Sequence, residues 1–357
     1  MEKVLSVIIP TYNMESLLPR CLDSLCRAKS LPWLDIIVVN DGSRDGSLTI
    51  ARRYAEEYGG SVSVVDKSNG NYGSTINAAL PLAKGKYVKI LDADDEVDST
   101  ELDRLVDELQ IASEDIIVMP FTEVHADGHR VVVRYDTLGR ESYAYGLRHG
   151  LDSVLSGGYI RFFLMHGLAY RTGLLTGMGY RQTEGVSYTD LEWATYPIYR
   201  AADIRFSTAK VYVYHLDRDG QTMAPEVLSR QAGQLLRVTM QLLEYHGAHR
   251  GELSDTRRQW FTLYLTNRVR IIYKLHLLDM PRQAFSAEAM ADAERQMEPY
   301  CQKFGLKPRL YPDNKIVRLD YIAYWSRHHR RWPCWLQTFS STLDSIAHKA
   351  YAWLRRK

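Results

Sequence analysis

Two glycine-rich phosphate-binding signatures are missing from this chain of 357 residues. Neither G-x-G-x-x-G nor G-x-x-x-x-G-K-[ST] occurs, and the first apolar run ends in Pro-Thr-Tyr-Asn at residues 10–13. Those signatures hold phosphates on backbone N–H groups where a helix begins. Their absence argues against a nicotinamide-dependent dehydrogenase and against a P-loop enzyme. A nucleotide bound here would need its phosphates held in another way.

Cysteine pairs, long apolar runs and net charge are also scarce. The four cysteines contain no C-x-x-C pair and no zinc-like cluster, which favours a reducing compartment. No window of 18 uncharged apolar residues occurs, and the N-terminal residues do not resemble a signal peptide, so we predict a cytoplasmic protein. The formal net charge of +2 provides no general attraction for nucleic acid.

Apolar runs and helical patterns alternate through the first hundred residues. The runs are apolar throughout, which is typical of strands covered on both faces of a sheet. The alternation predicts an α/β fold with a doubly wound, mainly parallel sheet. Such sheets bind ligands beyond the carboxyl ends of their strands, so the segments that follow the strands should converge. The predicted strands are 4–9, 34–40, 62–66 and 86–91, and the segments that follow them are 10–13, 41–45, 67–73 and 92–95.

The pattern changes after residue 100. We predict a helix at about 99–112, a strand at 115–121, a hairpin at 123–135 with its turn at Asp127-Gly128, an irregular stretch at 140–188 and a strand at 209–216. After Pro225 the patterns are helical, near 226–246, 254–278, 285–303 and 335–354. The sequence therefore predicts a catalytic or binding domain at 1–222 and a helical C-terminal region at 223–357, which would serve in packing, in oligomer formation or at a membrane surface.

An acidic cluster stands directly after the fourth predicted strand, in the stretch YVKILDADDE at 87–96. One interpretation is a solvated strand end that also caps the helix near Ser99. The other is that alternate carboxylates hold Mg²⁺ or Mn²⁺, which in turn holds a diphosphate. Asp41, in VVNDGS, likewise has two interpretations: a turn former, or an acceptor of hydrogen bonds from a base or ribose. Residue pattern alone leaves both alternatives open.

Five motifs appear in an order and at a spacing that resemble glycosyltransferase family 2: SVIIPTYN, VVNDGSRDGS, GNYGSTINAAL, AKGKYVKILDADD and VSYTDLEW. The resemblance covers residues 4 to about 222, and the last motif is the weakest. It implies a GT-A fold and an inverting transferase that uses a nucleotide diphosphate-sugar, most often a UDP-sugar, with Mn²⁺ or Mg²⁺. The acceptor would be a hydroxyl of a glycan or of a lipid-linked acceptor, as in polysaccharide or cell-surface glycan synthesis.

The resemblance assigns roles to individual residues. Asp190 matches the family's catalytic base, and Asp94 its metal-binding carboxylate. The positions matching the donor site are Pro10, Thr11, Tyr12, Asp41, Lys67, Asn71, Gly73, Asp92 and Asp94. Two departures weaken the match: Thr189 stands where the family has Glu before the base, and STINAAL replaces Ala-Arg-Asn, with Asn77 keeping one polar group. For Asp190 itself a simple helix N-cap is the alternative.

Four further polar residues have weaker assignments. His215 matches a region where some metal-dependent members of the family supply a histidine ligand, although a solvated loop histidine is the alternative. Arg218 and Gln221 fall in a loop that in the family closes over the donor diphosphate. His166 would line the acceptor side, unless it is a structural histidine.

The last segment, 327–357, is rich in Lys and Arg with Trp332, Trp335 and Trp353 among them. A basic, tryptophan-bearing amphipathic helix can lie on an anionic membrane surface, which would make the protein peripheral on the cytoplasmic face. A helix packed on the protein with a solvated basic face is the alternative. The helices at 226–303 could equally form a homodimer surface.

The sequence thus favours a metal-dependent inverting glycosyltransferase. A non-catalytic protein of the same fold, which binds a nucleotide-sugar or a partner, is the main alternative, and Asp92, Asp94 and Asp190 argue against it. A nucleotidyltransferase would need a basic phosphate-binding loop after the first strand, which Pro-Thr-Tyr-Asn does not supply.

Overall fold

A computed structural model describes the chain except for residue 1 and the segments 136–144, 158–161, 217–231, 311–319 and 334–357. It divides into two compact units, Met1–Asp219 with His249–Trp260 and Gly220–Ala248 with Phe261–Lys357. The roles predicted for a domain at 1–222 and a region at 223–357 stay predictions.

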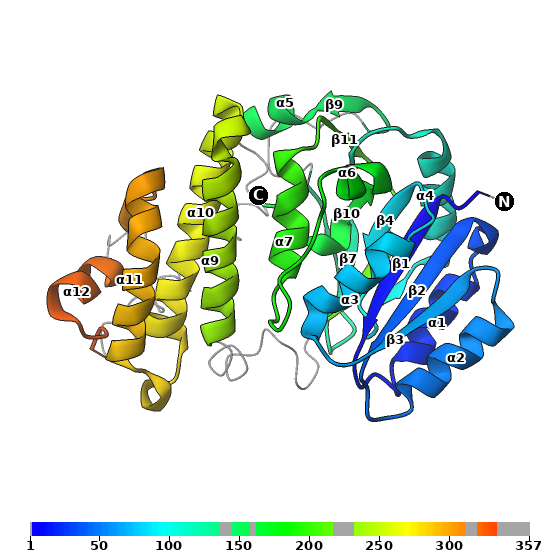
Figure 1. Cartoon of the computed structure of the whole chain (residues 1–357), viewed down its shortest axis with the longest axis horizontal. Helices are drawn as coiled ribbons and strands as arrows, with labels where there is room; N and C mark the ends of the chain where they lie inside the picture. Colours follow the sequence, from blue (N-terminus) through cyan, green and yellow to red (C-terminus); the bar gives the residue numbers. More distant parts are fainter. Residues whose placement is uncertain (1, 136–144, 158–161, 217–231, 311–319, 334–357) are drawn as a thin grey trace. The chain divides into compact units, whose positions relative to one another are not determined.

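The first unit is built on an eight-stranded sheet with the order β3-β2-β1-β4-β10-β6-β11-β9 (Figure 1). The neighbours β3, β2, β1 and β4 are mutually parallel, as predicted. β10 lies between β4 and β6 and runs antiparallel to both. The bounds are β1 Leu5–Thr11, β2 Leu34–Asp41, β3 Val62–Lys67, β4 Tyr87–Ile90, β6 Ile116–Val118, β9 Arg148–Gly150, β10 Leu168–Arg171 and β11 Asp203–Phe206.

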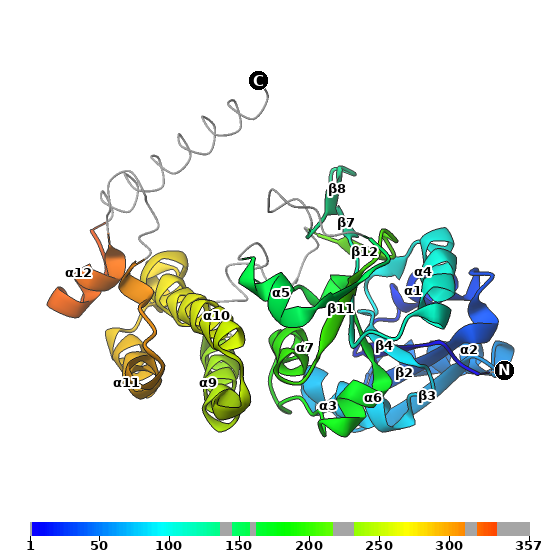
Figure 2. The ribbon, with the colours of Figure 1, turned by 90° about the horizontal axis from the view of Figure 1, so that it is seen from above.

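Helices cover both faces of this sheet, which explains why its strands are apolar throughout. Val7 and Ile9 of β1 join one buried cluster together with residues of α1, α2 and α4, whereas α3 contacts β1 and β2 from the opposite face (Figure 2). Asp98 begins α4 by accepting the backbone N–H groups of Thr100 and Glu101. The bounds are α1 Leu18–Cys26, α2 Ser47–Glu57, α3 Asn71–Ala79 and α4 Ser99–Ile111.

The prediction of one strand at 115–121 is wrong: this stretch contributes to two strands, which belong to two different sheets. β6 ends at Val118 and β7 runs from Phe121 to Val124 in a second sheet, with the order β5-β12-β7-β8. Pro120 separates them, because proline has no N–H with which to continue a ladder. The predicted hairpin is confirmed: β7 pairs antiparallel with β8 (Arg130–Val133), and Gly128 has a φ of +81°. The other strands of this sheet are β5 (Glu96–Val97) and β12 (Tyr212–His215).

The stretch predicted as irregular, 140–188, contains regular elements. Besides β9 and β10 it forms α5 (Leu151–Ser156) and α6 (Thr172–Gly177), and α7 (Asp190–Thr195) follows. These elements are too short to show a period in the sequence, and pairing with distant strands fixes them.

The second unit consists of helices in the residues that the structure describes. The segments predicted as long helices form α9 (Ala232–His249), α10 (Asp255–Lys274) and α11 (Ala287–Phe304). Buried His246 packs between Phe261 and Phe304, with ring centroids at 5.5 and 4.8 Å. A short helix, α12 (Tyr321–His328), was not predicted, and the helix predicted at 335–354 lies outside the described residues.

Only residues 327–333 of the basic segment are described: residues 327–330 are exposed, whereas the two residues that follow them are buried. Arg331 is buried and donates to the carbonyl oxygens of Leu277, Leu278 and Met280, and Trp332 is buried too. Trp335 and Trp353 lie outside the described residues. Among the helices that could be searched, none has the length and apolar character needed to cross a membrane.

Candidate active site

The segments that follow the first four strands meet, as predicted from the carboxyl ends of parallel strands. The side chain of Asn13 accepts the backbone N–H of Arg44 at 2.8 Å, which joins the segment after β1 to the segment after β2. The hydroxyl of Tyr72 donates to a carboxylate oxygen of Asp92 at 2.7 Å, which joins the start of α3 to the segment after β4. Polar groups from four strand ends therefore share one edge of the sheet.

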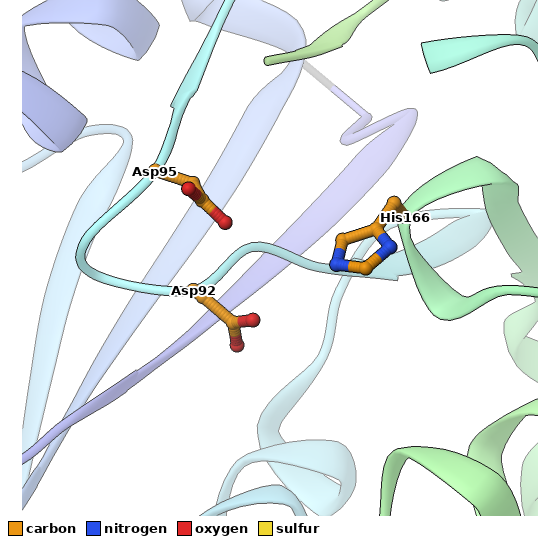
Figure 3. A group of neighbouring side chains, drawn as sticks. All are labelled: Asp92, Asp95 and His166. Atoms are coloured by element: carbon orange, nitrogen blue, oxygen red, sulfur yellow. The ribbon is translucent and has the colours of Figure 1, made fainter. Parts of the chain in front are cut away.

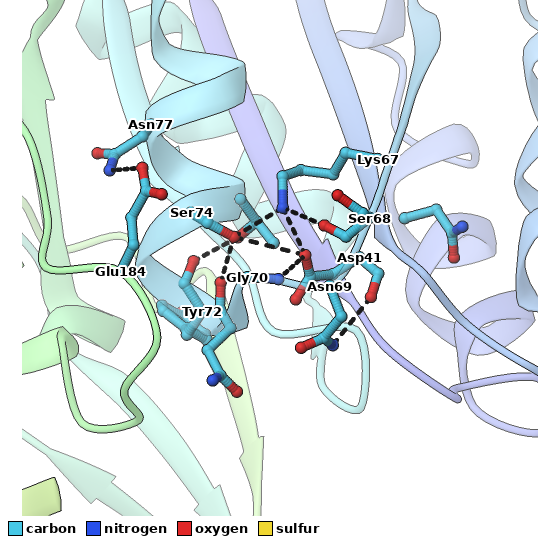
Figure 4. A network of polar contacts seen from close by, with 12 residues as sticks. Asp41, Lys67, Ser68, Asn69, Gly70, Tyr72, Ser74, Asn77 and Glu184 are labelled. Atoms are coloured by element: carbon cyan, nitrogen blue, oxygen red, sulfur yellow. Dashed lines mark hydrogen bonds and ion pairs between the residues drawn. The ribbon is translucent and has the colours of Figure 1, made fainter.

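Asp41 ends β2 and forms an ion pair with Lys67 (Figure 4). Its Oδ1 accepts Nζ of Lys67 at 2.7 Å and the backbone N–H of Gly70 at 3.0 Å. Lys67 also donates to the hydroxyl of Ser74 at 2.9 Å, so it holds the first turn of α3 to the strand. Asp41 is only 2% exposed. The cation that balances this carboxylate is therefore part of the chain.

Asp92 and Asp95 follow β4 and receive neutral donors. Tyr72 donates to Asp92, whereas Asp95 accepts the hydroxyl of Tyr212 at 2.7 Å and the backbone N–H of His215 at 2.8 Å. Burial, together with the charge of Asp94, raises the pKa of Asp92 to about 7. Burial also raises the pKa of Asp95 to about 8, with Asp92 and Asp94 adding to the effect. A cation that binds here would restore both carboxylates to their ionised form.

One Asp/His group in the described residues has the composition of a metal site: Asp92, Asp95 and His166, whose ligand atoms lie within 4.8 Å of one another (Figure 3). Two carboxylates and an imidazole suit Mn²⁺. Burial lowers the pKa of His166 to about 3, so the ring stays neutral, and its buried Nδ1 has no hydrogen-bond partner. The donor set therefore fits a divalent cation.

The predicted ligands Asp94 and His215 are not members of that group, and their ligand role stays a prediction. Nε2 of His215 lies 3.0 Å from a carboxylate oxygen of Glu96. The backbone carbonyl of Asp94 accepts the guanidinium of Arg20 at 2.6 Å. His166, predicted on the acceptor side, stacks on Tyr214 with ring centroids 4.3 Å apart.

Asp190 is the first residue of α7, and the N-cap position belongs to Thr189, which makes no side-chain cap bond. The structure therefore does not support the N-cap alternative for Asp190. Burial raises the pKa of Tyr72 well above its usual value, and the charges of Asp92 and Asp190 raise it further. Asp190 also helps to raise the pKa of Asp92. The predicted base and the acidic cluster thus lie close enough to affect each other's charge.

The remaining predicted donor residues surround the same edge. Tyr12 is 43% exposed, Pro10 is half-buried, and Thr11 is buried with its hydroxyl on the carbonyl of Ile9. Asn71 begins α3 with a φ of +64°. Arg218 and Gln221, predicted to close over the donor, lie outside the described residues.

Sequence reasoning did not identify three residues that shape the site. Tyr72 and Tyr212 hold the acidic cluster, and only the fold brings them to it. Lys89, only 1% exposed, donates to the carbonyls of His166 and Leu168, and burial lowers its pKa to about 7. The signal for Lys89 was present, since a lysine in the middle of the apolar run KYVKIL needs buried partners.

Residues 6–168 match the family model described as Glycosyl transferase family 2. The matched residues make up slightly less than half of the chain, and over them the sequence is similar to glycosyltransferase family 2. One relative, the uncharacterized glycosyltransferase EpsJ of Bacillus subtilis, is 35% identical over 127 residues, 36% of this chain and 36% of EpsJ. Another, the poly(ribitol-phosphate) beta-glucosyltransferase of Bacillus spizizenii, is 39% identical over 102 residues, 28% of this chain and 16% of its own length. Each alignment therefore covers less than half of the relative's own length.

Solved structures of low identity share the fold over more of the chain. Staphylococcus aureus TarS 1-349, in complex with UDP-GlcNAc, matches with a TM-score of 0.55 and 18% identity over 92% of this chain and 93% of its own. The mannosyltransferase PcManGT of Pyrobaculum calidifontis, in complex with GDP-Man and Mn²⁺, matches with a TM-score of 0.51 and 17% identity over 100% of this chain and 88% of its own. The likeness confirms the predicted fold class.

Proposed function

We propose that this protein transfers a sugar from a nucleotide diphosphate-sugar to an acceptor hydroxyl, with a divalent cation and with inversion at the anomeric carbon. The observation that carries the proposal is that Asp190 lies close enough to Asp92 for its charge to raise the pKa of Asp92. Both residues are at the edge of the sheet where the segments after β1, β2 and β4 meet. An enzyme of this type needs a base and a diphosphate-binding site side by side.

The donor is a UDP-sugar in this proposal. Tyr12, which is 43% exposed at the end of β1, offers a ring on which a nucleoside can stack. Asp41 ends β2, the strand that pairs with β1, and serves in this proposal as the hydrogen-bond acceptor for the base, held in place by Lys67. The UDP-GlcNAc complex of the structurally similar TarS supports a uridine donor, whereas the GDP-Man complex of PcManGT supports the alternative nucleotide.

The reaction requires one proton transfer and one displacement. Asp190 accepts the proton of the acceptor hydroxyl while the hydroxyl oxygen bonds to the anomeric carbon. The bond from that carbon to the nucleotide diphosphate breaks, and the nucleotide leaves with the electron pair. A single in-line displacement of this kind inverts the anomeric centre.

Mn²⁺ or Mg²⁺, when bound, supplies charge stabilisation for the departing diphosphate. Asp92 and Asp94 would hold it, and the group formed by Asp92, Asp95 and His166 offers the alternative ligand set. The acceptor in this proposal is a hydroxyl of a glycan or of a lipid-linked glycan. The relative named as a poly(ribitol-phosphate) beta-glucosyltransferase supports a polymeric acceptor.

The first test is calorimetric titration of the full chain with UDP, with and without Mn²⁺, and with GDP in parallel. We expect UDP to bind only when Mn²⁺ is present. Binding of neither nucleotide under any condition would contradict the proposal and favour the non-catalytic alternative, a protein of this fold that binds a partner without turnover.

The second test separates binding from chemistry. Asp190→Asn should bind UDP with Mn²⁺ like the wild type, but transfer sugar about 10²–10⁴-fold more slowly, because it removes the base and leaves the diphosphate site intact. Release of UDP from a panel of UDP-sugars measures the rate. Asp107→Asn, an exposed carboxylate on α4, is the matched control and should transfer at the wild-type rate. Transfer by Asp190→Asn at the control rate would show that Asp190 is not the base.

A further inference from the structure

The loop at 181–185 precedes α7, the helix that carries Asp190, and contacts α3, the helix that begins at the donor side. Asn77 lies on α3 and exchanges two hydrogen bonds with the backbone of Gln182: its Nδ2 donates to the carbonyl at 2.8 Å, and its Oδ1 accepts the N–H at 2.8 Å. Nδ2 also donates to Glu184 at 2.8 Å (Figure 4). An amide side chain that pairs with both the N–H and the C=O of one residue fixes the position and the orientation of the backbone at that residue.

The same loop is bound from the other side by a buried carboxylate. Glu192 lies on α7, two residues after Asp190, and none of its surface is exposed. Its Oε2 accepts the backbone N–H of Thr183 at 2.7 Å, and its Oε1 accepts the hydroxyl of Thr183 at 2.7 Å. A buried carboxylate is costly unless hydrogen-bond donors surround it. Moving the loop away from α7 would leave Glu192 without these donors, so the two bonds hold the loop to α7.

Close backbone packing completes the connection. A Cβ atom added to Gly73 would lie 2.2 Å from the carbonyl oxygen of Thr183, a distance that no side chain tolerates. The N–H of Gly185 donates to the carbonyl of Gly70 at 2.9 Å. The first turns of α3, which also contain the Ser74 that Lys67 contacts, therefore lie directly against the loop.

We propose that Asn77, Thr183 and Glu192 form a clamp that sets the position of Asp190 relative to the donor. The three are positioning residues: they act through the loop and the first turn of α7 without contact with substrate. The inference rests on the proposed function, because it concerns the base of the proposed transfer. A displacement of about 1 Å in a reacting group can cost about 100-fold in rate, so a clamp of this kind has a measurable effect.

Four variants of the full chain test the clamp. Glu192→Gln removes the negative charge and leaves one acceptor oxygen for the two groups of Thr183 that donate to Glu192. Asn77→Asp loses the bond to the carbonyl of Gln182. Thr183→Val removes the hydroxyl at constant shape, whereas Thr183→Ser keeps it. The matched surface control is Arg181→Gln, since Arg181 is exposed and pairs only with the half-exposed Glu184 among the ion pairs described.

If the clamp positions Asp190, its variants should lower kcat and leave the KM for the donor nearly unchanged. Glu192→Gln and Asn77→Asp should lower kcat about 10–100-fold. Thr183→Val should lower kcat less, and Thr183→Ser should restore it. The KM for the donor and the affinity for UDP with Mn²⁺ should stay within about twofold of the wild type. Rates are expressed per nucleotide-binding site, counted by UDP titration, so that misfolded protein does not count.

Amide hydrogen exchange across 182–190 supplies a readout that does not depend on activity. We expect faster exchange in Glu192→Gln and Asn77→Asp than in Arg181→Gln. Unchanged kcat per site in both clamp variants would overturn the inference and leave the clamp a purely structural feature. If the wild type transfers no sugar, the proposed function fails, and amide hydrogen exchange alone tests the clamp. Unchanged exchange in the clamp variants would then overturn the inference, whereas faster exchange across 186–190 would support it.

Discussion

Two carboxylate sites, one after β2 and one after β4, solve the same electrostatic problem in opposite ways. Asp41, after β2, is buried against Lys67 with 2.7 Å between Oδ1 and Nζ. Asp92 and Asp95, after β4, accept tyrosine hydroxyls and a backbone N–H, and burial raises their pKa to about 7 and about 8. The first site contains its own cation, whereas the second is suited to receive one. A carboxylate cluster therefore indicates ligand binding only when the donors around it are known.

The largest effect should come from removing the cation of the first site. Lys67→Met leaves Asp41 buried without its partner, and we expect it to lower the free energy of unfolding by about 3 kcal/mol, because an uncompensated buried charge is costly. Urea unfolding measures the change. Arg52→Met is the matched control: Arg52 pairs with Asp66 at 3.3 Å on the surface, and its loss should cost about 0.5 kcal/mol. Equal effects in the two variants would remove the contrast between the sites.

The second effect concerns the cation that the other site is proposed to receive. Asp94→Ala should weaken binding of UDP in the presence of Mn²⁺ by at least about tenfold, or 1.4 kcal/mol, and should leave stability without metal unchanged or higher, because it removes one of several like charges. Calorimetry with and without Mn²⁺ measures the affinity, and thermal unfolding in a chelator measures the stability. A variant that binds UDP with Mn²⁺ as tightly as the wild type would exclude Asp94 from the metal site.

The smallest effect is a pH dependence. The pKa of Asp95 is raised from 3.8 to about 8, so between those values the folded protein binds more protons than the unfolded chain, and stability falls as pH rises. Asp95→Asn removes this titrating carboxyl group and its contribution to the pH dependence of stability. Without divalent cation, we expect the Tm of the wild type relative to the variant to fall as the pH rises from 5 to 8. The comparison with the variant cancels other groups, such as Lys89, whose pKa is lowered to about 7. Parallel Tm curves would contradict the prediction.

Periodicity predicted the parts of the fold whose neighbours in space are neighbours in the chain. The first four strands and their helices are long and apolar, so their positions followed from the pattern within a few residues. The strand predicted at 115–121 failed because it begins in one sheet and ends in another. The prediction of an irregular stretch at 140–188 was wrong because short elements such as β10 depend on pairing with distant strands.

The candidate site shows the same division. Asp41 and Asp92 were predicted from their positions directly after apolar strands, and Asp190 from the resemblance of VSYTDLEW to a family motif. Tyr212 was not found, because it reaches Asp95 from a strand 117 residues further along. The hydrogen bond between Asn77 and Gln182 could not be predicted either, because the two residues are 105 residues apart in the chain.

By itself, the sequence determined the fold class, the edge of the sheet where the polar segments meet, and the residues that resemble a family 2 active site. Local apolar patterns and strand-end motifs are sufficient for these, because they depend on short stretches of chain. Only the tertiary structure decided which carboxylate is balanced by a lysine, which are surrounded by tyrosine hydroxyls, and which loop connects Asp190 to the donor side. Those properties depend on burial and on contacts between distant segments, and the pKa of a side chain follows from its surroundings in space.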